Sequence, residues 1–280
     1  MVYRDYWALS QWYAHYGRHL GEDNLFVVAH GNDPLVQRLC PKASIITIPR
    51  DDLQGFDRVR NKMLNGLQHA FGHMYDWVIR TDADELICLD PAVFRSFQDV
   101  FSTHDAPALF ALGLDVIELN NETTLNDGDL ALKHRSNAVL SGHYSKAWAV
   151  NDAVSLDRHG LKVRPGKLAE HSFVMPKGVY LAHLKFACRT ALATTDNQRI
   201  GIAQSNAKGL PGKAWKFADQ RTADFLTKAQ RLPVVDWQDA VTDAYERLKT
   251  PIRDTRQGIL RSKSVKFTYR TVLPPWFKNS

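Results

Sequence analysis

Hydrophobic and polar positions follow two recurring patterns along the chain. Apolar residues three or four apart predict amphipathic helices, most clearly over residues 6–20, where Asp5 is placed to cap the helix and Gly21 to end it. Further helices are expected from Asp33-Pro34 to Cys40, from Asp57, from Asp90-Pro91 and from Thr190 onward. Short apolar runs predict strands at residues 25–29, 44–48, 77–79, 108–114, 144–150, 153–156 and 179–184.

Strands that alternate with helices predict an α/β fold with a mostly parallel sheet flanked by helices, because parallel strands need crossover connections. Residues 120–142 are rich in Asn and Asp, so we expect an exposed loop of the kind that often covers a site. We place residues 1–200 in the main domain and residues 201–280 in a helical, basic C-terminal extension.

The most informative stretch is residues 75–90, YDWVIRTDADELICLD, where an apolar run is followed by Asp82, Asp84 and Glu85. The run at 77–79 predicts a strand buried on both faces, and carboxylates this close together call for a positive partner. Mg²⁺ or Mn²⁺ suits them, because these ions take oxygen ligands and complete their shells with water and phosphate. The alternative is a solvated acidic turn that ends a strand.

A second polar loop, with His30, Asn32 and Asp33, follows an earlier predicted strand. Ligands of parallel sheets bind where the strands have their carboxyl ends, so both loops are expected at one edge. Other nucleotide and hydrolase motifs are missing from the sequence: it has no P-loop, no G-x-G-x-x-G after a strand, no EF-hand loop and no G-x-S-x-G.

Charge is distributed unevenly along the 280 residues. The chain carries a net charge of +6, yet residues 249–280 alone hold eight Lys or Arg against one Asp, so the rest is close to neutral. A nucleic-acid-binding domain would spread positive charge over its folded face and show a known motif, so we expect no nucleic-acid partner.

Cys40, Cys88 and Cys188 are widely spaced and lack a C-x-x-C pair, which argues against a disulfide framework or a structural zinc site. The N-terminus lacks the apolar segment of a signal peptide, and no apolar run reaches eighteen residues. We therefore expect a cytoplasmic protein.

The basic tail ends in Leu273, two prolines, Trp276 and Phe277. Each cation near an anionic leaflet contributes about 1 kcal/mol and aromatic residues favour the interface, so we expect weak peripheral contact with the inner membrane through this tail. The alternative is a solvated basic helix with a disordered end.

Several segments together resemble bacterial glycosyltransferase family 2-like proteins, the group related to family 92. They are FVVAHGND, FDRVRNK, WVIRTDADEL and a later HLK, and the resemblance covers roughly residues 1–200. It implies a GT-A fold, a nucleotide-sugar donor, and Mn²⁺ or Mg²⁺ bridging Asp82 or Asp84 to the diphosphate. Two departures from the family pattern are Leu86, where phenylalanine is usual, and a first strand shortened to Val2 and Tyr3, followed by Arg4-Asp5 instead of Asn-Glu.

The resemblance also implies roles for individual residues. On the donor side it places Asp33, Asp57, Arg58, Arg60, Asp82 and Glu85. His183 resembles a downstream histidine that completes the metal shell, although a histidine satisfied within a buried strand is the equal alternative. Lys146 and His171 fall where the family has a lysine and a histidine, and we place them on the acceptor or phosphate side.

The expected reaction is transfer of one sugar to a glycan or lipid-linked acceptor with inversion, which needs a base to take the proton of the acceptor hydroxyl. Candidates for the base are Asp115, Asp152 and Glu170, and we favour Asp152 because it follows a predicted strand about seventy residues after the acidic motif. The alternatives are a non-catalytic nucleotide- or sugar-binding protein, and a nucleotidyl- or phosphotransferase.

Overall fold

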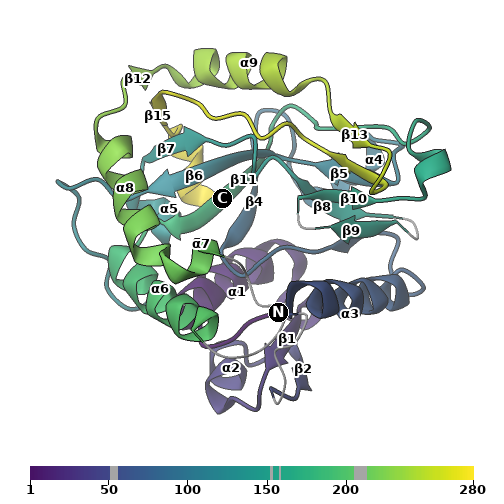
Figure 1. The fold of residues 1–280 in the computed structure, drawn as a ribbon, viewed down its shortest axis with the longest axis horizontal. Helices are drawn as coiled ribbons and strands as arrows, with labels where there is room; N and C mark the ends of the chain where they lie inside the picture. The colour runs from purple at the N-terminus through teal and green to yellow at the C-terminus, as the bar shows by residue number, and fades with distance from the viewer. Residues whose placement is uncertain (51–55, 152–153, 158, 205–212) are drawn as a thin grey trace.

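The computed structural model describes residues 1–50, 56–151, 154–157, 159–204 and 213–280, and it confirms the α/β class (Figure 1). The helices are α1 (Tyr6–Leu20), α2 (Pro34–Leu39), α3 (Phe56–Phe71), α4 (Phe97–Ser102), α5 (Ala131–His134), α6 (Arg189–Ala203), α7 (Lys213–Lys216), α8 (Ala218–Gln230) and α9 (Trp237–Leu248). The strands are β1 (Phe26–His30), β2 (Ser44–Ile48), β3 (Val78–Ile79), β4 (Glu85–Leu89), β5 (Ala108–Phe110), β6 (Leu112–Ile117), β7 (Asn137–Leu140), β8 (Ala147–Val150), β9 (Ser155–Asp157), β10 (Gly160–Lys162), β11 (Val179–Phe186), β12 (Val234–Val235), β13 (Ile252–Asp254), β14 (Ile259–Arg261) and β15 (Arg270–Val272). Short 3₁₀-helices occupy Glu22–Asn24, Pro165–Lys167 and Pro275–Asn279.

The sheets are mixed rather than mostly parallel, so that part of the prediction is wrong. The largest sheet has the order β12-β15-β7-β6-β11-β4, in which β12 with β15 and β6 with β11 are parallel while the other neighbours are antiparallel. The pair β1-β2 is parallel, and the sheets β3-β8-β5 and β13-β14-β10-β9 are antiparallel. Short links such as those between β9 and β10 or β13 and β14 allow antiparallel pairing without a crossover helix.

Strand β11 lies between β6 and β4 in the largest sheet and is almost entirely buried, as its apolar sequence VYLAHLKF requires. It runs parallel to β6 and antiparallel to β4, and the register pairs His183 with Asp115 on one side and with Glu85 on the other. Three polar side chains, one each from β6, β11 and β4, are therefore brought to the same level of the sheet.

Helix α1 confirms the predicted bounds, with Asp5 accepting the Ala8 N–H at its start. It also covers the outer edge of β4. The Ile87 N–H donates to the Tyr16 hydroxyl at 3.0 Å, and His15 Nε2 donates to the Ile87 carbonyl at 2.9 Å. These side chains satisfy backbone groups that a bare edge strand would expose, so α1 closes the sheet on this side.

A glycine on β6 allows the chain to cross that strand closely. A Cβ on Gly113 would lie 2.2 Å from the carbonyl carbon of Tyr144, which no side chain can tolerate. The Gly113 N–H donates to Ser145 Oγ at 2.9 Å, and its carbonyl accepts the Ser141 N–H at 2.8 Å. The turn that carries Tyr144 is thus fixed directly over the middle of the sheet.

Three local predictions need correction. The segment 120–142, expected to be an exposed loop, contains α5 and the buried strand β7 within the largest sheet. Asp90-Pro91 forms a turn, and the helix begins only after Ser96, whose hydroxyl accepts the Asp99 N–H. The strand before the acidic motif is reduced to β3 and is half-buried rather than buried on both faces.

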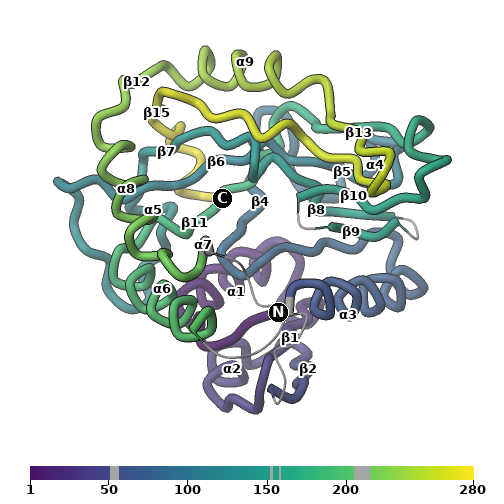
Figure 2. The backbone as a smooth tube through the Cα atoms, in the orientation of Figure 1, coloured from purple at the N-terminus to yellow at the C-terminus, as the bar shows by residue number. Residues whose placement is uncertain are grey.

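The C-terminal extension is not only helical, because β13, β14 and β15 lie within it. Figure 2 shows this last segment, in yellow, crossing the molecule from β13 to β15. Phe277, one of the two aromatic residues expected to favour a membrane interface, is 1% exposed and packs against Tyr180 and Trp237 inside the fold. Buried aromatic rings of this size stabilise the fold and are not free to enter a bilayer.

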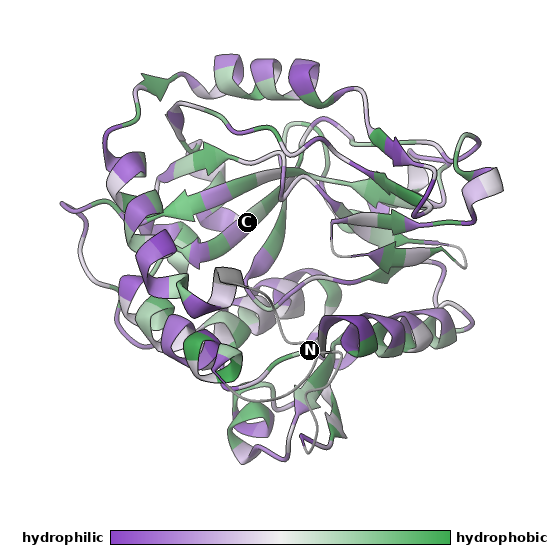
Figure 3. Cartoon of the chain, viewed as in Figure 1, coloured by the Kyte–Doolittle hydropathy of each residue, from purple (hydrophilic) through white to green (hydrophobic). Residues whose placement is uncertain are grey.

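One hydrophobic core spans the expected boundary at residue 200. It joins Leu9 and Val27 from the first part of the chain with Val241 and Phe277 from the last. In Figure 3 hydrophobic residues dominate the central strands, whereas α3 and α9 also carry hydrophilic ones. Among the described helices, none combines the length and the apolar character needed to cross a bilayer.

Candidate functional site

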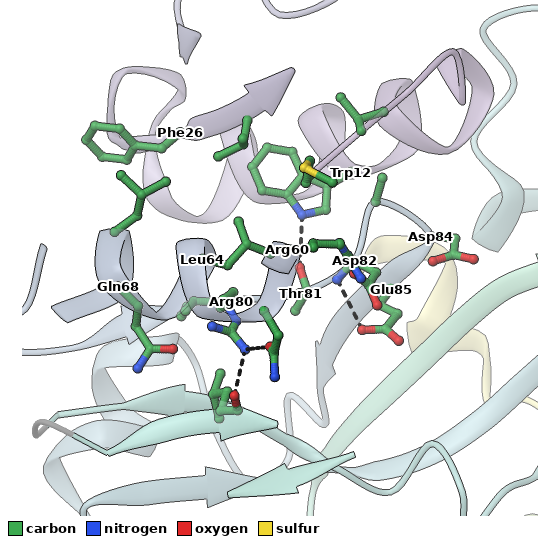
Figure 4. Close-up of a pocket in the computed structure, with 18 of the residues that line it drawn as sticks. Trp12, Phe26, Arg60, Leu64, Gln68, Arg80, Thr81, Asp82, Asp84 and Glu85 are labelled. Atoms are coloured by element: carbon green, nitrogen blue, oxygen red, sulfur yellow. Dashed lines mark hydrogen bonds and ion pairs between the residues drawn. The ribbon is translucent and has the colours of Figure 1, made fainter. Parts of the chain in front are cut away.

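A cavity of about 730 Å³ lies among residues of α1, β1, α3, the β3–β4 turn, β11 and α6. Figure 4 shows Asp82, Asp84 and Glu85 together at one end, with Phe26 and Gln68 at the other. A concave space of this size that combines apolar walls with convergent charged groups is typical of a small-ligand site.

The acidic residues are held by a tight turn between β3 and β4. The Arg80 N–H pairs with the Trp148 carbonyl at 2.8 Å, which ends β3. Beyond it the Glu85 N–H donates to the Asp82 carbonyl at 3.1 Å, and the Asp82 N–H donates to Glu85 Oε2 at 3.2 Å. These reciprocal bonds close the turn and keep the carboxylates beside the cavity, so they are part of a built structure rather than a loose acidic loop.

Two cations neutralise Asp82 and Glu85. Arg60 from α3 forms an ion pair with Asp82, and Lys146 Nζ lies 2.7 Å from Glu85 Oε1 and 3.5 Å from Asp82 Oδ2. Desolvation raises the pKa of Asp82, but Arg60 and Lys146 outweigh it and hold the pKa well below its usual range. Burial lowers the pKa of Lys146, yet Glu85 and Asp82 more than compensate and raise it. Desolvation raises the pKa of Glu85, and Lys146 offsets this only in part. The Arg60–Asp82 pair is therefore charged at neutral pH.

His183 from β11 lies between two other carboxylates. Its Nδ1 donates to Asp115 Oδ1 at 2.6 Å, and its Nε2 lies 3.3 Å from Asp84 Oδ2. Tyr144 stacks on the imidazole with ring centroids 3.7 Å apart. Burial lowers the pKa of His183, but Asp84 and Asp115 outweigh it and raise the pKa to about 9. Desolvation raises the pKa of Asp84, and His183 in turn brings it below its ordinary value.

Asp84 and His183 fit a divalent cation better than Asp82 does. Two cis ligands of an octahedral ion with bonds of about 2.1 Å are about 3 Å apart, close to the 3.3 Å between Asp84 Oδ2 and His183 Nε2. The described part of the chain has no group of three or more His, Cys, Asp or Glu side chains that could hold a metal. Two side chains suffice where water and phosphate complete the shell, and a cation at Nε2 would replace a proton there.

Arg80, which precedes the acidic motif, directs its side-chain hydrogen bonds away from the three carboxylates of the turn. Its guanidinium donates to Asn65 Oδ1 at 2.7 Å, and to Asn61 Oδ1 and the Leu156 carbonyl, both at 3.2 Å. Asn61 and Asn65 lie one turn apart on α3, so this polar face joins the helix to β9. The role of Arg80 is to hold the cavity wall together.

The predicted donor-side residues are only partly brought together. Asp57 and Arg60 line the cavity with the acidic turn, whereas Arg58 is exposed and does not line it. Asp33 lines a neighbouring hollow of about 400 Å³ and accepts a hydrogen bond from the Tyr6 hydroxyl at 2.8 Å. Tyr3, His30 and Arg50 line both spaces, so the two are adjacent.

The three candidate bases lie in different places relative to the cavity. Asp115 does not line the cavity, because it lies beneath His183 and binds its ring. Glu170 is exposed, pairs with Lys167 at 2.8 Å, and is not a cavity residue. Asp152 lies outside the described residues.

Of the two residues expected on the acceptor or phosphate side, only one lines the cavity. Lys146 lines the cavity and is bound to the acidic turn. His171 is not among the cavity residues, and its carbonyl accepts a hydrogen bond from Arg253 at 2.9 Å. The structure thus keeps Lys146 in the site and leaves His171 out of it.

Sequence reasoning missed Tyr144 and Arg199. Tyr144 falls in a predicted strand, and its position two residues before Lys146 is the only signal in the sequence that marks it. Arg199 lines the cavity from α6 and pairs with Asp196 at 3.2 Å. No local motif marks Arg199, because its place depends on how α6 packs.

Neither a scan against protein-family models nor a search of curated proteins finds a match for this chain.

Proposed function

We propose that this protein is a metal-dependent glycosyltransferase that moves one sugar from a nucleotide-sugar donor to a glycan or lipid-linked acceptor. The observation that carries the proposal is the placement of Asp84 Oδ2 and His183 Nε2, 3.3 Å apart, in a cavity of about 730 Å³. A GT-A fold is part of the same proposal, and the resemblance of residues 1–200 to glycosyltransferase family 2-like proteins supports it.

The residues around the cavity support distinct roles. Asp84 and His183 would hold Mn²⁺ or Mg²⁺, which when bound neutralises charge on the leaving diphosphate. Lys146 and Arg60, which both bind the neighbouring Asp82, would supply positive charge toward phosphate oxygens. Apolar residues of the cavity wall, such as Phe26 and Leu64, would exclude water from the donor.

The acceptor hydroxyl must lose a proton as it attacks the anomeric carbon. Asp115 is poorly placed to take it, because its carboxylate is buried and already bonded to His183. Asp152 is the remaining candidate that we favour, on the sequence argument alone.

The test compares Asp84→Ala with Asp76→Ala, an exposed carboxylate in the same segment. Each variant is incubated with a panel of nucleotide sugars and Mn²⁺, with and without excess chelator. We expect Asp84→Ala to lose about 100-fold or more in donor turnover while it still unfolds in one cooperative transition, because charge rather than apolar packing is removed. Asp76→Ala should behave as wild type.

Product analysis separates the alternatives. Released nucleoside diphosphate supports sugar transfer, whereas pyrophosphate would indicate a nucleotidyltransferase. Metal-dependent nucleotide binding without turnover would indicate a binding protein. Full activity in excess chelator, or in Asp84→Ala, would refute the metal assignment.

A further inference from the structure

Two residues outside the predicted metal set hold His183 from different sides. Asp115 accepts the Nδ1 hydrogen at 2.6 Å, and the ring of Tyr144 stacks on the imidazole at 3.7 Å with 23° between the planes. Asp115 is 7% exposed and His183 2%. The imidazole is therefore fixed in rotation and in the plane of its ring, with Nε2 as the nitrogen directed to Asp84.

The backbone sets this arrangement before any ligand binds. Asp115 and His183 are register partners on the parallel strands β6 and β11. The Leu184 N–H donates to the Asp84 carbonyl at 2.7 Å, which ties the acidic turn to β11. Gly113 allows the turn with Tyr144 to approach β6. Each group that surrounds His183 is thus attached to a rigid part of the sheet.

We propose that Asp115 and Tyr144 are positioning residues: they hold His183 Nε2 beside Asp84, so that the two side chains form a divalent-cation site before any cation binds. A carboxylate on the distal nitrogen fixes the ring of a metal-binding histidine and increases its basicity as a ligand. The stacked tyrosine removes the remaining freedom of the ring, so less order has to be imposed when a cation binds. This inference rests on the proposed function, because it concerns the same cation site, Asp84 and His183.

The test measures Mn²⁺ affinity of the full chain by electron paramagnetic resonance of free Mn²⁺, without donor or turnover. Asp115→Asn keeps the size of the side chain and removes its charge, and Tyr144→Leu removes the stacked ring. Tyr144→Phe keeps the ring, and Asp76→Asn is the exposed control. The ¹⁵N shifts of His183 without metal give a second readout of the ring state.

We expect Asp115→Asn to bind Mn²⁺ 10- to 100-fold more weakly, as for other outer carboxylates of metal-binding histidines. Its His183 shifts should also differ from wild type. Tyr144→Leu should weaken binding, and Tyr144→Phe should restore it. If Tyr144 had only a structural role, both Tyr144 variants would be less stable than wild type, and their Mn²⁺ affinities would not differ from each other.

Mn²⁺ affinity of Asp115→Asn within twofold of wild type, or equal losses in both Tyr144 variants, would overturn the inference. If wild type binds Mn²⁺ and turns over a donor, that result leaves the proposed function intact. If wild type binds no Mn²⁺ with or without nucleotide, both proposals fail.

Discussion

Replacing Gly113 by alanine tests whether the crossing of β6 by the turn that carries Tyr144 demands a glycine. The added Cβ would lie 2.2 Å from the Tyr144 carbonyl carbon, 2.5 Å from its oxygen and 2.6 Å from the Ser145 nitrogen. Carbon atoms in contact are about 3.5 Å apart, so the turn would have to move by about 1 Å. The neighbours are backbone atoms, which cannot rotate away as a flexible side chain can.

The expected cost follows from these contacts. Overpacking of a core typically costs about 1–3 kcal/mol. The shift would also strain two buried hydrogen bonds, from Gly113 N–H to Ser145 Oγ and from Ser141 N–H to the Gly113 carbonyl, each contributing about 1 kcal/mol. We expect Gly113→Ala to lower the unfolding free energy by about 3 kcal/mol, measured by urea titration.

Gly66→Ala is the matched control, because a Cβ there meets nothing within 4 Å and Gly66 lies inside α3. Alanine favours helix by about 1 kcal/mol over glycine, so this variant should be slightly more stable than wild type. If Gly113→Ala unfolds at the wild-type urea concentration, the steric argument fails, and so does the claim that this glycine fixes Tyr144.

Two further predictions concern buried rings outside the acidic turn. Burial lowers the pKa of His15 from 6.5 to about 3, so stability should be lost as the pH falls from 6.5 toward 3, by about 2 kcal/mol between pH 6.5 and 4.5. In urea titrations at pH 6.5 and 4.5, His15→Gln should lose about 2 kcal/mol less unfolding free energy than wild type. An equal loss in wild type and variant would contradict the prediction. Phe277→Ala should lower the unfolding free energy by about 3–5 kcal/mol and leave co-sedimentation with anionic vesicles unchanged. Unchanged stability together with weaker co-sedimentation would instead support Phe277 as a membrane contact.

Local chemistry accounts for what could be predicted from the sequence. The bounds of α1 follow from Asp5, Gly21 and an apolar stripe, and all three act within one segment. The cluster of Asp82, Asp84 and Glu85 is likewise local, since a single turn carries it. Such features depend on neighbours in sequence, so a pattern can reveal them.

Pairings across long distances could not be predicted in the same way. β7 lies in an Asn- and Asp-rich segment, yet tertiary pairing with β6 and β15 makes it a strand. Asp115 was a plausible base as an isolated carboxylate, but the register with His183, 68 residues away, places it under the ring. Its role depends on which strands become neighbours, and no local pattern records that.

The charges at the acidic end explain why a cation would help donor binding. Four carboxylates, those of Asp82, Asp84, Glu85 and Asp115, are bound by three cationic partners, Arg60, Lys146 and His183, so the acidic groups of this cluster outnumber the basic ones by one. An anionic diphosphate would meet repulsion there, of about 4 kcal/mol for two unit charges 4 Å apart at an effective dielectric constant of 20. Exchanging the Nε2 proton for a divalent cation adds one positive charge and removes the excess. Donor affinity should therefore rise with Mn²⁺ in wild type, and this gain should be lost when Asp84 is replaced.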